Sequence, residues 1–256
     1  MVSQAMYTGA SALTNHQRNL DVIGNNIANI NNNGFKASRV DFRDGLYRAM
    51  INPADNSPAL NLQSGLGLHI SQLQANFLQG ALAETGDPMD LALEGDGFFV
   101  YQSSAGELRY SRVGAMRISN EEDGMWLVSP QGHYLLDENN NRIRFQGLPS
   151  QLSVTADGTL YFGGEGQGFA PVRLQIVDFS NKQGLSSNGA YFTETENSGL
   201  RALSNATVLQ HYEERSNVDL AEQTTRMIRA QRAFQFASRI VSVADQMAGL
   251  CNTIRS

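Results

Sequence analysis

Charged residues and cysteine are both scarce in this sequence, and each shortage excludes a class of protein. Charged residues form 17% of the 256 residues, and the formal net charge at pH 7 is −6. Nonspecific binding to nucleic acid requires a basic face that displaces counterions from phosphates. We therefore expect no nucleic-acid partner. We also expect the surface to owe its polarity largely to Asn, Gln, Ser and Thr.

A single cysteine, Cys251, excludes an intrachain disulfide and any metal site built from several cysteines. We interpret it as a small apolar residue on one face of a helix. No histidine has a second histidine three or four residues away, as a metal-binding helix would require. The histidines are His16, His69, His133 and His211.

Long apolar runs are missing as well. No run reaches the roughly 18 residues that a membrane-spanning helix needs. The beginning of the sequence lacks the basic start and the continuous apolar run of a secretory signal, so we expect no cleaved signal peptide. Composition alone would suggest the cytoplasm, but it does not exclude an export route that leaves no compositional trace.

Residues that could carry catalysis occur only in weak patterns. The glycine-rich run at 163–168 has no Lys-Ser or Lys-Thr after it, so we interpret it as a surface loop. Acids gather at Asp87, Asp90, Glu94 and Asp96. Their spacing misses the calcium-loop pattern, and the Pro and Gly residues beside them are typical of turns. We expect no enzyme activity, no cofactor, no metal and no small-molecule substrate.

The first part of the sequence has helical periodicity. Residues 3–29 carry one apolar stripe, which consists of Met6, Leu13, Leu20, Ile23 and Ile27. The stripe ends in an Asn-rich run and Gly34, which are typical of a helix end. A shorter amphipathic helical piece is expected at 40–50, with Phe42, Leu46 and Met50 on one face. Residues 51–83 contain Pro53 and Pro58 and indicate an irregular connection.

The last part of the sequence predicts a long helix at 217–254, about 55 Å in length. Asp219 is an acceptor suited to its start. One heptad row is large, and consists of Leu220, Met227, Phe234, Val241 and Ala248. A second row is small, and consists of Gln223, Ala230, Ala237, Ala244 and Cys251. A third row consists of Ile228, Ile240, Val243, Met247, Leu250 and Ile254. Because three rows exceed a two-helix seam, this helix needs more than one partner.

Between these ends, residues 84–209 change to short apolar runs punctuated by glycine. Asp157-Gly158 between two such runs is a hairpin signal. Other expected strands are 98–101, 108–118, 125–128, 134–136, 143–145 and 172–179. The fold class is therefore α+β and discontinuous: terminal helices that pair as a coiled-coil layer, with a central antiparallel all-β domain inserted between them. The expected division is a helical segment at 1–50, a connection at 51–83, the β domain at 84–209 and a helical segment at 210–256.

Two interpretations of the helices follow from periodicity alone. Their stripes either join several copies of the chain or pack within one chain, as in a helical hairpin on a β domain. A protein of another class, a secreted surface- or carbohydrate-binding β module with coiled-coil arms, would need exposed aromatic residues. Only Trp126 and scattered tyrosines are candidates for that role.

Three ordered segments resemble the flagellar rod and hook family. Residues 20–36 read LDVIGNNIANINNNGFK. In the family, an Asn-Asn-hydrophobe-Ala-Asn core leads into Thr-x-Gly-Phe/Tyr-Lys. Here Asn32 stands where Thr is usual and Gly24 stands where Ala or Ser is common. Residues 86–99, GDPMDLALEGDGFF, resemble the opening of the family's β domain. The C-terminal motif is matched by SNVDL at 216–220, AQRAF at 230–234 and DQM at 245–247, although His211 lies where a glycine is expected.

This resemblance implies a structural subunit of the flagellar basal-body rod. It implies uncleaved export through the flagellum's own type III apparatus to the basal body. It also implies polymerisation into a hollow helical tube for motility, with copies of itself and other rod and hook proteins as partners. Residues 40–47 and the Ser-Gly-Leu-Gly run at 64–67 are most similar to the distal rod branch. A proximal rod component or a rod-like paralogue is the alternative within the family.

The stripes and the motifs together predict an assembly interface. Its residues are Met6, Leu13, Leu20, Ile23, Asn25, Asn26, Ile27, Asn29, Gly34, Phe35, Leu220, Met227, Ala230, Phe234, Ala237, Val241, Ala244 and Ala248.

Overall fold

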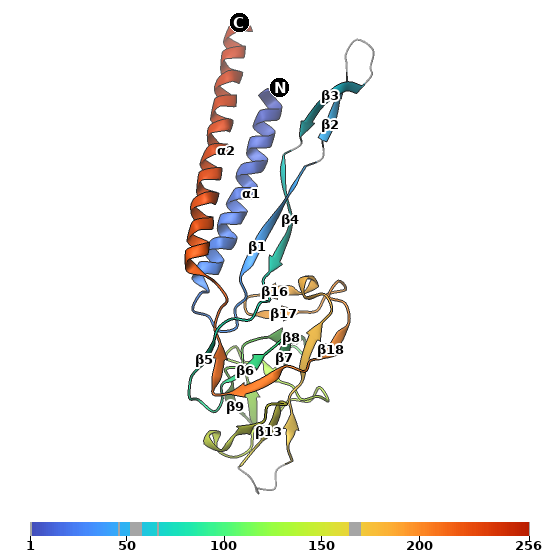
Figure 1. Cartoon of the computed structure of the whole chain (residues 1–256), viewed down its shortest axis with the longest axis vertical. Helices are drawn as coiled ribbons and strands as arrows, with labels where there is room; N and C mark the ends of the chain where they lie inside the picture. Colours follow the sequence, from blue (N-terminus) through green and yellow to red (C-terminus); the bar gives the residue numbers. More distant parts are fainter. Residues whose placement is uncertain (1, 46, 52–57, 66, 164–169, 256) are drawn as a thin grey trace. The chain divides into compact units, whose positions relative to one another are not determined.

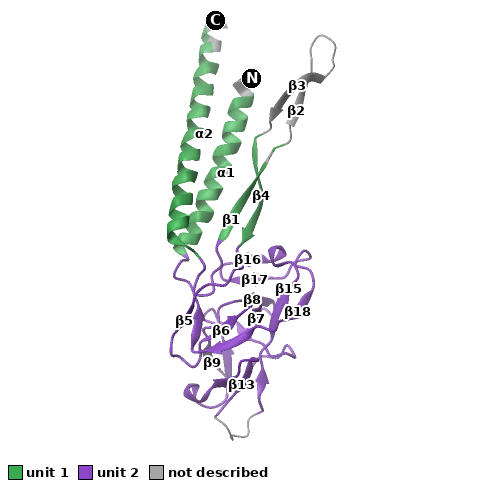
Figure 2. Cartoon of the chain, viewed as in Figure 1, with its two compact units in different colours: residues 1–28, 38–75, 218–256 green, residues 29–37, 76–217 purple. Residues whose placement is uncertain are grey.

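The structure is a computed structural model that describes residues 2–45, 47–51, 58–65, 67–163 and 170–255. The chain divides into two compact units (Figure 2). Unit 1 comprises Met1–Ala28, Ser38–Ala75 and Val218–Ser256, and unit 2 comprises Asn29–Ala37 and Asn76–Asn217. The chain therefore passes between the units four times, because the middle segment of unit 1, Ser38–Ala75, separates the two parts of unit 2. The α+β class is confirmed.

Unit 1 is built on two helices, α1 (Val2–Ala28) and α2 (Leu220–Arg255), which lie side by side (Figure 1). Both helices expected from the periodicity are confirmed. Asp219 begins α2 as expected, because its Oδ1 accepts hydrogen bonds from the amides of Ala221 at 2.8 Å and Glu222 at 3.2 Å. These are amides that have no partner within a helix, so the cap stabilises the first turn.

Unit 1 also contains strands where the sequence analysis expected none. β1 (Ser38–Asp44) pairs antiparallel with β4 (Leu68–Ala75), and β2 (Tyr47–Ile51) pairs with β3 (Pro58–Gly65). The helical piece expected at 40–50 is wrong. The irregular connection expected at 51–83 is also wrong where β3, β4 and the later strand β5 (Leu82–Glu84) form. The reason is that apolar residues four apart fit one helical turn and also two periods of a strand. Leu46 and Pro53 lie outside the described residues.

The β1–β4 pair lies beside α1 (Figure 1), and polar and aromatic contacts hold it there. The backbone oxygen of Leu68 accepts hydrogen bonds from Ser11 Oγ at 2.8 Å and from Asn15 Nδ2. The ring of His16 lies 5.8 Å from the ring of Phe42, measured between centroids. These contacts make the strand pair part of unit 1 and not a free arm.

Unit 2 is a set of short antiparallel strands. Its largest sheet runs in the order β16-β17-β8-β7-β11-β10-β9, and β15 joins β7 to β18. Smaller sheets pair β5 with β20, β6 with β19, and β12 with β13 and β14. Besides β5, the strands are β6 (Leu91–Glu94), β7 (Phe98–Gln102), β8 (Leu108–Ser111), β9 (Arg117–Glu121), β10 (Gly124–Val128), β11 (Tyr134–Leu135), β12 (Ser153–Val154), β13 (Thr159–Tyr161), β14 (Val172–Arg173), β15 (Ile176–Phe179), β16 (Ser186–Asn188), β17 (Tyr191–Thr193), β18 (Arg201–Leu203), β19 (Thr207–Gln210) and β20 (Tyr212–Glu214).

Several of the expected strands of unit 2 are confirmed, and others are broken in two. The hairpin at Asp157-Gly158 is formed by β12 and β13. The single strand expected at 108–118 is divided into β8 and β9. Between them, Gly114 passes so close to β6 that a Cβ atom there would lie 1.6 Å from the oxygen of Leu91. Residues 143–145 form no named strand, but an isolated bridge between Trp126 and Arg144 pairs them with β10. Most of the 163–168 loop lies outside the described residues.

The core of unit 2 consists of aromatic and aliphatic side chains that are fully buried. Its largest buried side chains are less than 2% exposed, and they are Tyr101, Tyr110, Tyr191, Phe98, Phe99, Phe192, Leu91, Leu93, Leu127, Leu135, Leu136 and Ile143. Alternate residues of a strand point to opposite faces. Because four successive residues of β7 are all buried, β7 has both faces covered and forms the centre of this unit.

Candidate assembly surface

The two helices of unit 1 meet along the small residues of α2. Ala230, Ala237 and Ala244 are each 4% exposed and recur every seven residues. On α1, a Cβ atom added to Gly9 would lie 2.7 Å from Cγ2 of Val241. With no side chain at Gly9 and only methyl groups on the alanine row, the two backbones approach closely, and the seam is tightly packed.

A buried amide pair crosses the same seam. Asn26 of α1 is 1% exposed, and its Nδ2 donates to Gln223 Oε1 of α2 at 3.1 Å. Its Nδ2 also donates to the oxygen of Ser38 at 2.7 Å, and its Oδ1 accepts from the amide of Ser38 at 2.9 Å. Each partner would be left unsatisfied by a shift along the helix, so Asn26 fixes the register of α1, α2 and β1. Because Asn26 faces Gln223 and Gly9 faces Val241, the helices run antiparallel.

The structure separates the predicted interface residues into four sets. The first set is buried in unit 1 and consists of Ile23, Asn26, Ala230, Ala237 and Ala244. The second set is half-buried there and consists of Met6, Leu13, Leu20, Ile27, Met227, Phe234, Val241 and Ala248. Asn25 and Leu220 are exposed, whereas Asn29, Gly34 and Phe35 belong to unit 2. Most of the predicted residues of the first two sets therefore lie on faces that contribute to packing within one chain.

A different row of α2 is exposed and apolar. Phe236, Ile240, Val243, Met247 and Leu250 are 67%, 38%, 48%, 53% and 64% exposed. Their spacing of four, three, four and three residues is that of a coiled-coil seam. Four of the five belong to the third row of the sequence analysis. Phe236 was not included in that row.

Gly34 and Phe35 close a turn inside unit 2. Gly34 has φ of 68°, and a Cβ atom there would lie 2.7 Å from the amide nitrogen of Val113, so only glycine fits. Phe35 is 4% exposed. His211, at a position where a glycine was expected, also has a positive φ of 68°. The left-handed backbone of that turn is therefore kept although the residue is not glycine, and this is a conformation that costs a non-glycine residue free energy.

The acids that drew attention in the sequence act as turn and surface residues. Asp87 Oδ1 accepts from the amide of Met89 at 2.9 Å, and Asp96 pairs with Lys182 at 3.1 Å. Burial, with Asp90 and Asp87 nearby, raises the pKa of Glu213. Within the described part of the chain, no group of three or more His, Cys, Asp or Glu residues is placed to hold a metal ion.

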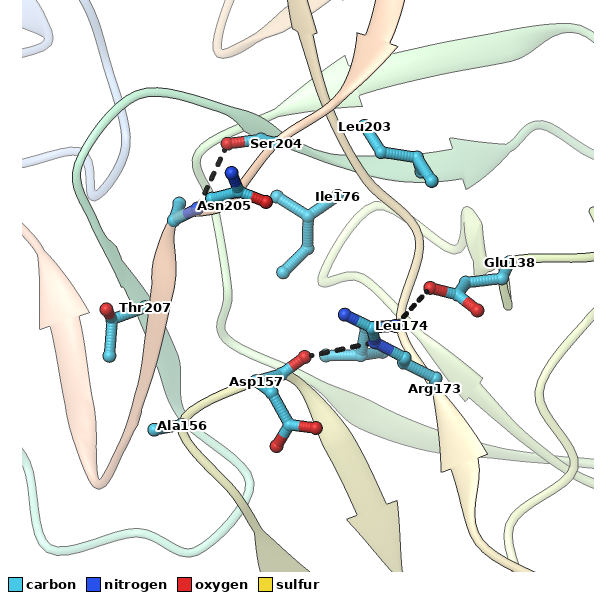
Figure 3. A pocket seen from close by; sticks show the side chains of 11 residues that line it. Glu138, Ala156, Asp157, Arg173, Leu174, Ile176, Leu203, Ser204, Asn205 and Thr207 are labelled. Carbon is cyan, nitrogen blue, oxygen red and sulfur yellow. Dashed lines mark hydrogen bonds and ion pairs between the residues drawn. The ribbon is translucent and has the colours of Figure 1, made fainter.

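A hollow of about 420 Å³ in unit 2 is the candidate for a ligand site (Figure 3). Arg173 on its wall pairs with Glu138 at 3.1 Å, and Arg173 Nε lies 3.4 Å from the oxygen of Asp157. The Asp157 carboxylate accepts from the hydroxyls of Thr155 and Thr159, which hold its pKa below the usual value. The charged groups on the wall of the hollow therefore bind one another or neighbouring hydroxyls.

Comparison with known proteins identifies the family of the chain. Residues 6–36 match the family described as flagella basal body rod protein. Residues 92–162 match the flagellar hook protein FlgE/F/G D1 domain, and residues 209–254 match the flagellar basal body rod FlgEFG protein C-terminal region. A flagellar basal-body rod protein FlgG of Caulobacter vibrioides is 33% identical over 271 residues, covering 99% of this chain and 100% of that protein. The chain belongs to the flagellar rod and hook family.

Other members of the flagellar rod and hook family show similar coverage. The flagellar basal-body rod protein FlgG of Bacillus subtilis is 32% identical over 95% of this chain and 96% of its own. The flagellar hook-basal body complex protein FlhP of the same organism is 28% identical over 98% of this chain and 99% of its own. The chain is a structural subunit of the flagellar basal body and not an enzyme. None of its described helices is long and apolar enough to cross a membrane.

Proposed function

We propose that the chain is a distal rod subunit that polymerises with copies of itself through its terminal helices. In this proposal, α1 and α2 form a coiled-coil layer, and the exposed row at Phe236, Ile240, Val243, Met247 and Leu250 receives helices of neighbouring copies. The product is a hollow helical shaft that drives motility.

The observation that carries this proposal is the exposed row itself. From Phe236 to Leu250 it extends about 21 Å along α2. Burial of each such side chain stabilises by about 1.5–3 kcal/mol, so a chain that leaves five of them exposed gains free energy when a partner helix covers them. The seam that holds α1 to α2 is already filled, so the free row is the surface left for a neighbour.

Two phenylalanines separated by one residue provide a matched test. Phe234 is half-buried in the α1–α2 seam, and Phe236 is 67% exposed. We expect Phe236→Ala to leave the helical content and stability of the dilute monomer unchanged and to abolish polymers. We expect Phe234→Ala to destabilise the helix pair first, and to lose assembly as a consequence.

Sedimentation and electron microscopy of the two full-length variants beside the wild type will test this expectation, with far-UV circular dichroism of the monomers as the control. Phe236→Ala polymers equal in length and number to those of the wild type would show that the row is not the interface between copies. Loss of helicity in Phe236→Ala monomers would instead assign the row to folding.

The remaining parts of the proposal concern position and delivery. Similarity to rod proteins over nearly the full length supports a rod position, and we assign the distal one, with a proximal component or paralogue as the alternative. Its partners are other rod and hook proteins, and its delivery is uncleaved export through the flagellar type III apparatus. Addition of purified hook subunits to preformed polymers tests the position. Growth of hook on the polymer end supports a distal place, and failure to add argues for a proximal one.

A further inference from the structure

Three charged side chains are buried together in unit 2, and the proposed assembly surface uses none of them. They are Lys36, Arg112 and Glu214, and their side chains are 1%, 3% and 0% exposed. Lys36 Nζ lies 2.5 Å from Glu214 Oε1, and Arg112 Nη1 lies 3.4 Å from Glu214 Oε2. Removal of one partner from a buried ionic cluster of this kind strongly destabilises the fold.

Glu214 ties several distant segments together. Its Oε1 accepts from the amide of Gly80 at 2.8 Å, and its backbone oxygen accepts from the amide of Gly34 at 2.7 Å. Lys36 Nζ also donates to the oxygen of Leu78 at 2.8 Å. Arg112 Nη2 donates to the backbone oxygen of Gly95 at 2.7 Å. The Glu214 carboxylate thus joins the segment before α2 to Lys36 at the end of the N-terminal motif, to Arg112 just after β8, and to Gly80.

The residues after Glu214 also bind backbone groups near Lys36 and Gly80. Asn217 Oδ1 accepts from the amide of Ala37 at 2.8 Å, and Asn217 Nδ2 donates to the oxygens of Asn76 and Leu78, each at 2.8 Å. Gly80 lies so near this segment that a Cβ atom there would be 2.0 Å from the oxygen of Arg215. The segment at 214–217 is therefore seated in a slot that leaves no room for a displaced register.

The charges of the cluster are unequal. Lys36 and Arg112 are two cations that share the single carboxylate of Glu214. Burial lowers the pKa of both cations, and Glu214 offsets this effect in each case. Removal of the Glu214 charge leaves two buried cations without their closest anion. Removal of Lys36 leaves one balanced pair.

We propose that residues 213–217 are a latch, and that unit 2 completes its fold only when this segment docks against Gly34, Lys36 and Arg112. Because the latch directly precedes α2, closure of the β unit requires that the chain be available up to the start of its last helix. The fold of unit 2 thereby depends on residues 213–217, which lie immediately before the C-terminal helix.

The test compares full-length variants by hydrogen exchange of the amides of residues 76–212. We expect Glu214→Gln, which keeps the shape and the Gly80 hydrogen bond, to speed exchange by about 100-fold or more throughout this range. Lys36→Met is expected to have a smaller effect, and the double variant is expected to recover part of the loss. Glu138→Gln is the matched control, because its partner Arg173 is on the surface of the same unit.

Two results would overturn the latch. One is accelerated exchange confined to the residues next to Glu214. The other is an effect of Lys36→Met as large as that of Glu214→Gln. If Glu214→Gln does not yield folded protein, Asn217→Ala carries the test, since it removes three hydrogen bonds without stranding a charge. Faster exchange across all of 76–212 supports the latch, and a change limited to the amides near Ala37 and Asn76 contradicts it.

Discussion

The two units of the chain bury their apolar residues in opposite ways. Unit 2 encloses every one of the largest fully buried side chains, including Phe99 and Tyr101. Unit 1 buries mainly small or amide side chains between its helices and leaves Phe236 and Leu250 exposed. A unit that buries its large apolar residues gains the free energy of their burial by its own folding. A unit that buries small residues and exposes large apolar ones would gain that free energy only when a partner covers the exposed ones.

The largest expected effect comes from opening the core of unit 2. Phe99→Ala is expected to lower the free energy of unfolding by about 3–5 kcal/mol, because it removes a fully buried ring and leaves a cavity. The sole tryptophan, Trp126, lies in unit 2, so its fluorescence in a urea titration reports that unit. Far-UV circular dichroism reports mainly α1 and α2.

We expect the Trp126 transition of Phe99→Ala to move to lower urea by more than the helical transition does. Coincident shifts of equal size would break the comparison, because they would show that the two units unfold as one.

A smaller effect is expected from filling the seam of unit 1. Gly9→Ala places a methyl group 2.7 Å from Val241 Cγ2, and overpacking of this kind costs about 1–3 kcal/mol. A gain of up to about 1 kcal/mol in helix propensity offsets part of this cost. The measurement is the helical transition in urea.

Gly24 is the matched control for Gly9, because nothing lies within 4 Å of a Cβ atom at that position of the same helix. Gly24→Ala should therefore stabilise the helices. Val241→Ala combined with Gly9→Ala should recover part of the stability. If Gly9→Ala and Gly24→Ala behave alike, the close approach of the helices is not real.

The smallest expected effect is a dependence on pH that differs between the units. Burial lowers the pKa of His16 in unit 1, and burial with Arg109 lowers the pKa of His133 in unit 2. Below the ordinary histidine pKa of 6.5, the unfolded chain therefore binds more protons than the folded chain does. Each unit thus loses stability as the pH falls through the lowered pKa.

Urea titrations at pH about 7.5 and about 5.5 measure this loss. His16→Gln should flatten the pH dependence of the helical transition and leave that of Trp126 fluorescence. His133→Gln should do the reverse. An unchanged slope in both variants would exclude these histidines as its source.

The sequence was sufficient for the helices and for much of unit 2, because their signals are local. The stripe of α1, the heptads of α2 and the Asp157-Gly158 hairpin each depend on residues near one another in the chain. β1 was missed because its apolar spacing fits a helix equally well, and only its pairing with β4 decides between them.

The candidate site was less predictable, because it depends on which face of α2 meets α1. Periodicity identified three rows on α2 and could not rank them. The choice of the alanine row depends on Gly9, a lone glycine whose signal is weak without the partner helix. The buried contact of Lys36 with Glu214 joins residues 178 positions apart, and no pattern within either motif indicates it.

The hydrogen bond from Asn217 Nδ2 to the backbone oxygen of Asn76 brings together the two ends of the 76–217 segment of unit 2. A module whose two ends meet makes little demand on the chain that carries it, because the flanking segments need only two adjacent attachment points. Its interior can then be lengthened, shortened or exchanged for an unrelated domain while the attachment points keep their spacing. The rod subunit is in this sense a carrier, and a foreign domain spliced between Asn76 and Asn217 would be displayed without redesign of the helices.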